Sequence, residues 1–136
     1  MKKFAVVLFL LFTGNSMNNF VFSQTEVEGV IESFFDKYEQ SNSDAIDYLF
    51  ATNDWMKGNN DGINQIKIQL RNFLELVGEY HGYEKVSEIS KGECLTQLTY
   101  FVKYDRQPIR FIFVFYNPNN EWRIQNFLFD DKILED

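Results

Sequence analysis

The stretch from Leu95 to Asp130 constrains the fold more than any other part of the chain. Three of its segments, LTQLTYFVKY, IRFIFVFYN and EWRIQNFLFD, combine a period of two with many aromatic and β-branched residues. Two short segments rich in Asn, Asp and Pro separate them, and these residues are typical of turns. The pattern predicts three consecutive antiparallel strands, at Cys94–Tyr104, Ile109–Tyr116 and Trp122–Phe129.

A fourth strand is predicted upstream of these three. The side-chain period changes from 3.6 to 2 at Glu79, and the new pattern runs to about Ser90 before the turn at 91–93. Gly82 lies inside this segment and indicates a bulge or bend, because an isolated Gly in a strand often marks one.

The mature chain opens with three predicted helices. Apolar residues at helical spacing predict the first over Glu26–Gln40, and Thr25 and Glu28 have the spacing of a capping box. The second is predicted over Asp44–Ala51 with Ser43 as its N-cap. The third begins after Asn60 or Asp61 and runs to about Val77, where Gly78 is the expected C-cap.

The predicted strand Ile109–Tyr116 is apolar on both faces. An antiparallel sheet with one solvated face alternates between apolar and polar side chains. Helices account for one face. The second face is either covered by a partner, most simply by a second copy of the chain, or partly covered by long side chains of neighbouring strands.

The first 23 residues have the features of a signal peptide. Lys2 and Lys3 precede an apolar run of nine residues, Phe4–Phe12, which is too short to span a bilayer of about 30 Å. A polar stretch follows, and Ser23 offers a small residue before the cleavage position. We therefore expect a signal peptide over 1–23, one domain over 24–136, and an exported protein that is periplasmic or secreted.

Charge narrows the classes of partner. The chain has 13 basic and 20 acidic residues, and residues 1–23 contain two of the basic ones and no acidic residue. The chain from Gln24 onward therefore carries a net charge of −9 by that count. Such a surface repels phosphate backbones, so nucleic acids are not expected as partners, and neither is stable binding to a membrane after cleavage.

Helices followed by a meander predict an α+β domain, with N-terminal helices packed on a curved four-stranded antiparallel sheet. The segments FFDKYEQ and DAIDYLFATNDW, and the late strands with their WRIQNF, resemble the NTF2-like (cystatin-like, SnoaL-type) superfamily. This superfamily includes ketosteroid isomerases and polyketide-cyclase-type proteins. The resemblance covers most of residues 24–136. The chain is similar, in particular, to small exported bacterial proteins. It implies a cone-shaped sheet with an internal pocket, and it concerns the fold rather than an activity.

Several side chains are candidates for lining such a pocket, although each also fits a structural role. Aromatic walls with a few hydroxyls are typical of small-molecule sites, and the same residues equally serve as core. Trp55, in a polar loop, either lids the pocket or plugs the open end of the cone. The candidate ligand-binding residues are Tyr48, Trp55, Tyr80, His81, Tyr100, Tyr104, Arg110 and Trp122.

Reactive groups are few. His81 is the one histidine and a candidate general base, as is Asp47, if either points into the cone beside a Tyr. Cys94 is the one cysteine; it is expected to be a small buried side chain, because no basic residue beside it suggests a thiolate. Asp105 and Arg110 are expected to pair across a hairpin. No metal or cofactor motif is present in the sequence.

Three functions remain open on these grounds. The first is a non-enzymatic exported domain that binds a small apolar or amphipathic molecule or a protein partner, including a homodimer formed through the sheet. The second is an isomerase- or cyclase-type enzyme with a general base inside the cone. The third is a structural or inhibitory protein that acts through the exposed face of the sheet.

Overall fold

The computed structural model describes residues 26–134. The chain divides into two compact units, residues 1–32 and 33–136. Of the first unit, residues 26–32 are described, and they are helical. The predicted signal peptide, its cleavage position and the capping residue Thr25 lie outside the described residues.

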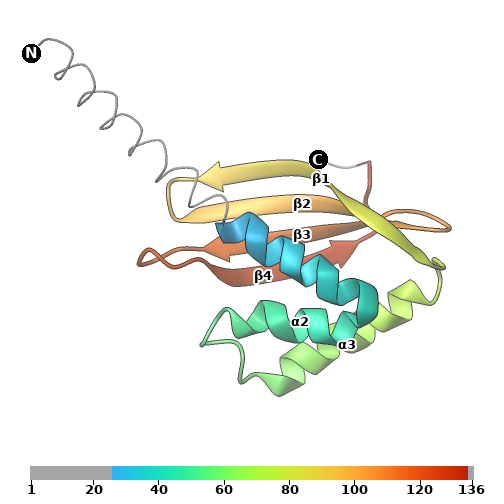
Figure 1. Ribbon diagram of the computed structural model, residues 1–136, viewed down its shortest axis with the longest axis horizontal. Helices are drawn as coiled ribbons and strands as arrows, with labels where there is room; N and C mark the ends of the chain where they lie inside the picture. The colour runs from blue at the N-terminus through green and yellow to red at the C-terminus, as the bar shows by residue number, and fades with distance from the viewer. Residues whose placement is uncertain (1–25, 135–136) are drawn as a thin grey trace, which may run out of the picture. The chain divides into compact units, whose positions relative to one another are not determined.

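Within residues 33–134, three helices are followed by one four-stranded antiparallel sheet, as the sequence predicts (Figure 1). Residues 33–40 form the first helix. The other elements are α2 (Asn42–Ala51), α3 (Asn60–Leu74), β1 (Tyr80–Lys91), β2 (Leu95–Tyr104), β3 (Ile109–Tyr116) and β4 (Arg123–Asp130).

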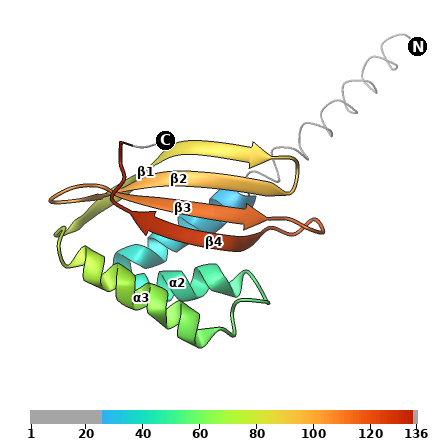
Figure 2. The same cartoon turned by 180° about the vertical axis from the view of Figure 1, so that it is seen from behind.

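The sheet is a meander with the strand order β1-β2-β3-β4, so β3 is an inner strand. Figure 2 shows the face of the sheet that α2 and α3 leave uncovered. Residues that pair directly across antiparallel strands share a face. On the helix side, Leu98 pairs with Phe113, which pairs in turn with Phe127. On the other side, called the outer face, Thr99 pairs with Ile112, which pairs in turn with Leu128.

The core lies between the sheet and the helices, and aromatic rings fill much of it. Phe34 and Phe35 are fully buried on the helix over 33–40. The Phe34 ring lies 5.2 Å from that of Phe113 and 5.8 Å from that of Phe127, between ring centroids. Phe35 stacks on Tyr83 at 3.8 Å. These edge and stacked contacts add to the apolar area that the rings bury.

The helix starts differ from the predicted ones because other side chains make the caps. α2 starts at Asn42, since the Oγ of Ser41, rather than that of Ser43, accepts the backbone N–H of Asp44 at 3.3 Å. The N-cap of α3 is Asn59, whose Oδ1 accepts the N–H of Gly62 at 3.2 Å. Both caps are earlier polar residues of the same clusters.

The predicted end of α3 is also wrong. The helix stops at Leu74, and its C-cap is Glu75 rather than Gly78. Gly78 lies in the turn before β1 with φ +88°, where a Cβ would come within 2.6 Å of the Asp105 carboxylate. The glycine is therefore required by a close approach and a positive φ, not by the helix end.

The predicted bulge at Gly82 is confirmed. The pairing of β1 with β2 shifts between Tyr80 and Gly82, and Gly82 has φ +112°. A second shift, between Lys85 and Ser87, leaves Val86 opposite no residue of β2. The strand limits agree with the predicted ones to within one residue at each end.

Candidate functional site

The structure does not gather the predicted ligand-binding residues into one pocket. Tyr100 is 5% exposed and belongs to the core. Its ring lies 5.7 Å from those of Phe35 and Phe113 and 6.0 Å from that of Tyr83. Tyr100 is therefore a core residue rather than part of a pocket wall, because protein side chains surround its ring on the helix side of the sheet.

Tyr80 and Tyr104 do come together, beside Tyr38, at one corner of the core. The rings of Tyr80 and Tyr104 lie 6.0 Å apart, and Tyr38 packs 5.4 Å from Tyr80. The hydroxyls of Tyr38 and Tyr104 form a buried hydrogen bond. Tyr38 is not among the site residues that the sequence predicts, because its helical spacing assigns it only to an apolar face.

Burial changes the acidity of these phenols. Loss of solvent is the main cause that raises the pKa of Tyr38 and Tyr104. Loss of solvent, and after it the neighbouring Tyr83, raises the pKa of Tyr80 to about 12. All three phenols therefore stay protonated at neutral pH, and they can donate hydrogen bonds but do not act as bases.

His81 lies beside this corner but forms a separate, solvent-exposed pair with Asp105. The His81 Nε2–H donates to Asp105 Oδ1 at 2.5 Å, and both side chains are 53% exposed. Asp105 Oδ2 accepts the backbone N–H of Glu79 at 2.9 Å. The bond from His81, and after it the one from Glu79, lowers the pKa of the Asp105 carboxyl.

The expected pairing of Asp105 with Arg110 is wrong. Arg110 points to the outer face and makes a bidentate contact with Asp130, at 2.9 Å and 2.7 Å. The two-pronged bond lowers the pKa of Asp130. The guanidinium is held across β3 and β4 because those residues are direct partners in the register.

Two further candidates have other contacts. Tyr48 lies under Lys37, whose Nζ is 5.2 Å from the ring centroid. Asp47, the alternative general base, pairs with Lys67 at 2.7 Å. The prediction that Cys94 is buried is wrong: it lies in the β1–β2 turn and is exposed.

Trp55 is 87% exposed, so it does not plug the end of a cone. Its loop is held by Asn53, a buried residue that the sequence did not single out. Asn53 Nδ2 donates to the Ile124 carbonyl at 2.7 Å, and Asn53 Oδ1 accepts the Trp55 N–H at 2.9 Å. One amide thus binds the loop to the start of β4 and fixes the backbone of the tryptophan.

Trp122 and Arg123 follow at the same end of the sheet. The guanidinium of Arg123 lies 6.0 Å from the ring centroid of Tyr116, its cross-strand partner on the outer face. Among the described residues, the buried Trp122 Nε1 and Arg123 Nε have no hydrogen-bond acceptor.

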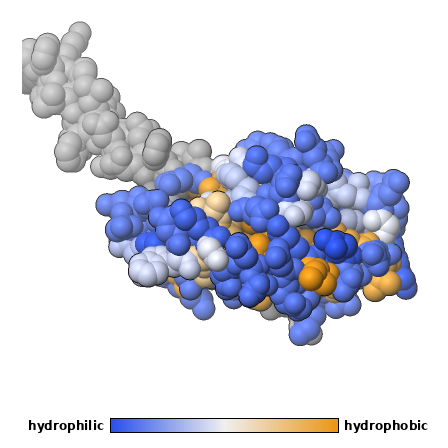
Figure 3. Space-filling view, turned by 90° about the horizontal axis from the view of Figure 1, so that it is seen from below, coloured by the Kyte–Doolittle hydropathy of each residue, from blue (hydrophilic) through white to orange (hydrophobic). Residues whose placement is uncertain are grey.

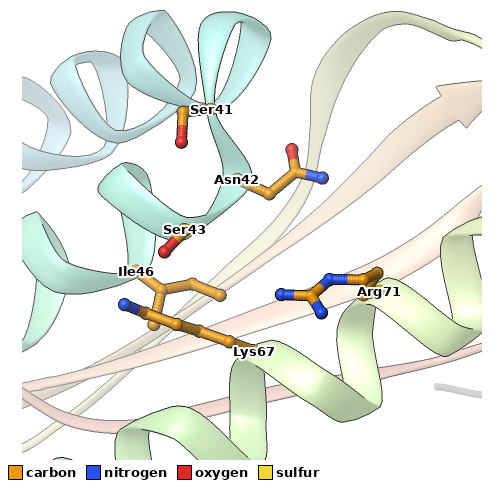
Figure 4. Close-up of a pocket in the computed structure, with 6 residues that line it drawn as sticks. All are labelled: Ser41, Asn42, Ser43, Ile46, Lys67 and Arg71. Carbon is orange, nitrogen blue, oxygen red and sulfur yellow. The ribbon is translucent and has the colours of Figure 1, made fainter.

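A hollow of about 230 Å³ lies between the start of α2 and α3 (Figure 4). Its lining residues are Ser41, Asn42, Ser43, Ile46, Lys67 and Arg71. Figure 4 shows Lys67 and Arg71 extending from α3 toward the beginning of α2. Asp47 already neutralises Lys67, so Arg71 supplies the remaining positive charge. Spacing along the sequence does not predict this hollow, because its residues come from two helices.

The outer face of the sheet carries apolar side chains on every strand, with the polar Gln97 and Thr99 among them. Ile89 is 48% exposed and Leu128 is 47% exposed, and between them lie half-buried apolar side chains of β2 and β3. These residues of the two inner strands are Leu95, Phe101, Ile112, Val114 and Tyr116. By contrast, Figure 3, seen from the side of α2 and α3, shows a mainly hydrophilic surface with small separate hydrophobic patches.

Among residues 26–134, no cluster of three or more His, Cys, Asp and Glu side chains is placed to hold a metal ion. None of the helices in this range is long and apolar enough to cross a membrane. No protein-family model, no curated protein and no solved structure matches the chain.

Proposed function

We propose that the chain is an exported, non-enzymatic interaction domain with an NTF2-like cone fold, and that its outer sheet face pairs with a second copy of itself. One observation carries this proposal: an apolar set with at least one partly exposed side chain from each of the four strands lies on that face. Two of its members, Ile89 and Leu128, lie on the edge strands and expose nearly half of their surface. Large apolar side chains exposed together on one face are typical of interfaces.

The arrangement of charge on the outer face supports the same proposal. Its charged side chains are Glu84, Lys91, Lys103, Arg110, Arg123 and Asp130, and all of them except Glu84 lie at or next to the end of a strand. The centre, around Thr99 and Ile112, carries no charge. An uncharged centre with a charged rim is the usual anatomy of a protein interface.

The interior of the helix side argues against the alternatives. Tyr100 and its neighbours occupy the region where a cone pocket is expected. The hydroxyls of Tyr38 and Tyr104 bind each other, and His81 is engaged with Asp105 at the surface. A general base beside a free Tyr donor, which the enzyme hypothesis requires, is not formed by these residues.

Sedimentation equilibrium of the purified chain tests the proposal. We expect the wild-type chain to dimerise, and Leu128→Glu to weaken dimerisation at least tenfold, about 1.4 kcal/mol, because a carboxylate would be buried within the contact. Ile68→Glu is the matched control, since Ile68 on α3 is 46% exposed and Leu128 is 47% exposed. A wild-type chain that stays monomeric, or equal weakening by both variants, would disprove the proposal.

A second candidate function is favoured by the hollow between α2 and α3. A small carboxylate fits it, with its charge against Arg71. We expect a short-chain carboxylate such as butyrate to shift the backbone amide resonances of Asn42 and Ser43 in a saturable way. Arg71→Gln should remove the shift, and Arg106→Gln, which alters a cation elsewhere, should not. Unsaturable or identical shifts would exclude this site.

A further inference from the structure

Trp55 combines high exposure with a fixed position. Its indole is 87% exposed, and no ring or cation among residues 26–134 packs on it. Transfer of an exposed indole out of water normally lowers the free energy of the system. A ligand that covered this indole would therefore gain favourable binding free energy.

The loop that carries Trp55 is not held by that side chain. Asn53 is 3% exposed and anchors the loop to β4 through Ile124. The Asn53 carbonyl accepts the N–H groups of Met56 and Lys57, both at 3.0 Å. Asp54 and Lys57 pair at 2.9 Å. A ligand that met the indole would find it already positioned, with little ordering of the loop left to do.

The neighbours of Trp55 restrict the chemistry of that ligand. The exposed residues next to it in the sequence are polar, namely Asp54, Lys57, Asn59 and Asn60, and Met56 is half-buried. A protein-binding hot spot is normally ringed by contacts that exclude water, and this loop offers no such apolar ring. Stacking of a nucleobase is opposed by the net charge of −7, which repels the accompanying phosphates.

We propose that Trp55 is a stacking platform for a pyranose ring of a polysaccharide. One face of a pyranose consists of C–H groups whose hydrogens carry a small positive charge, and the face of an indole is negative. The hydroxyls around the sugar ring match the Asp54 carboxylate, the Lys57 ammonium group and the Asn60 amide in hydrogen-bonding capacity. This site is separate from the proposed contact between two copies.

Isothermal titration calorimetry tests the proposal directly, because its signal does not depend on the tryptophan that the variants remove. The probes are cellohexaose, chitohexaose and maltohexaose, each titrated into the purified chain. At least one should give a saturable change that weakens tenfold or more in Trp55→Ala. Trp55→Phe should retain part of the affinity, since a smaller ring still stacks. Asn53→Ala should weaken binding because the loop loses its anchor.

Two control variants complete the experiment. Trp122→Phe should leave the affinity unchanged, and so should Leu76→Ala, which removes another exposed apolar side chain, 67% exposed. The proposal is overturned if none of the three hexasaccharides gives a saturable change, or if Trp55→Ala binds as well as the wild type. It is also overturned if Trp55→Ala abolishes dimerisation instead, because the indole would then be a protein contact. If only Leu128→Glu loses dimerisation, the proposal for Trp55 is not affected.

Discussion

At the scale of single residues, the clearest prediction concerns Asn53, because its buried side-chain amide donates one hydrogen bond and accepts another. Asn53→Ala removes two hydrogen bonds and leaves the Ile124 carbonyl without its donor, which should cost roughly 1–3 kcal/mol in the free energy of unfolding. Urea denaturation measures the loss. Asn119→Ala, at an exposed turn residue, is the control and should change stability by less than about 0.5 kcal/mol. Equal effects of the two would contradict the anchoring role.

The buried hydroxyl pair makes a second prediction at this scale. Tyr38→Phe leaves the hydroxyl of Tyr104 without its partner, and Tyr104→Phe does the same to Tyr38. Each single variant should lose roughly 1–3 kcal/mol of stability, whereas the double variant should lose much less than the sum. A double-mutant cycle by denaturation checks this. Additive losses would show that the two hydroxyls do not depend on each other.

Partners of polar side chains were the part of the structure that the sequence predicted least well. Asp105 and Arg110 are close in sequence and were expected to pair, but the register places Asp130 opposite Arg110. Asp105 instead contacts His81, 24 residues away along the chain. Spacing along one strand says which face a residue occupies, but the choice of partner depends on which residue of another strand lies opposite.

At the scale of elements, the α3–β1 turn and the β2–β3 turn form one braced corner. Asp105 N donates to the Glu79 carbonyl at 3.1 Å, and Arg106 N donates to the Val77 carbonyl at 2.9 Å. The Asp105 carboxylate adds its bonds to His81 and Glu79. This corner requires Gly78, because any Cβ there would meet the carboxylate.

The carboxylate makes the stability of this corner depend on pH. The pKa of Asp105 is lowered in the folded chain, so its contribution is present above the usual aspartate value of about 3.9 and is lost as the pH falls through the folded value. Asp105→Asn should therefore have a flatter loss of stability in acid than the wild type. Thermal unfolding followed from neutral to acidic pH measures the two slopes, and parallel curves would contradict the prediction.

Elements themselves were predicted closely where periodicity is strong. The strand Ile109–Tyr116 has the predicted limits, and the bulge at Gly82 is present. Errors occur at helix starts, where Ser41 and Asn59 cap instead of neighbouring residues. Several adjacent Ser, Asn and Asp residues are all competent caps, so the sequence indicates the cluster, and local geometry selects the member.

At the scale of the whole molecule, the candidate surfaces come from residues that are distant in sequence. The outer face takes one or more apolar residues from each strand, and period two predicted those of β3 correctly. The platform at Trp55 depends on contacts between residues 53 and 124, and the hollow depends on two helices. Such contacts between distant segments have no periodic signature, which is why the sequence did not reveal them.

Charge at this scale gives the last prediction, which concerns the proposed dimer. The outer face has four cations and two carboxylates, an excess of two positive charges, although the chain carries −7. Two copies therefore repel each other both face to face and overall. Raising the ionic strength from about 10 mM to about 150 mM shortens the screening length from about 30 Å to about 8 Å, so dimerisation should strengthen several-fold.

Sedimentation at the two ionic strengths measures this change, and Lys103→Gln separates the two sources of repulsion. The variant removes a cation from the outer face but makes the whole chain more negative. If repulsion between the faces dominates, Lys103→Gln should dimerise more tightly than the wild type at low salt and depend less on salt. Weaker dimerisation of the variant would assign the repulsion to net charge. A dimer that dissociates as salt rises would instead show that ion pairs, rather than the apolar centre of the sheet, hold the two copies together.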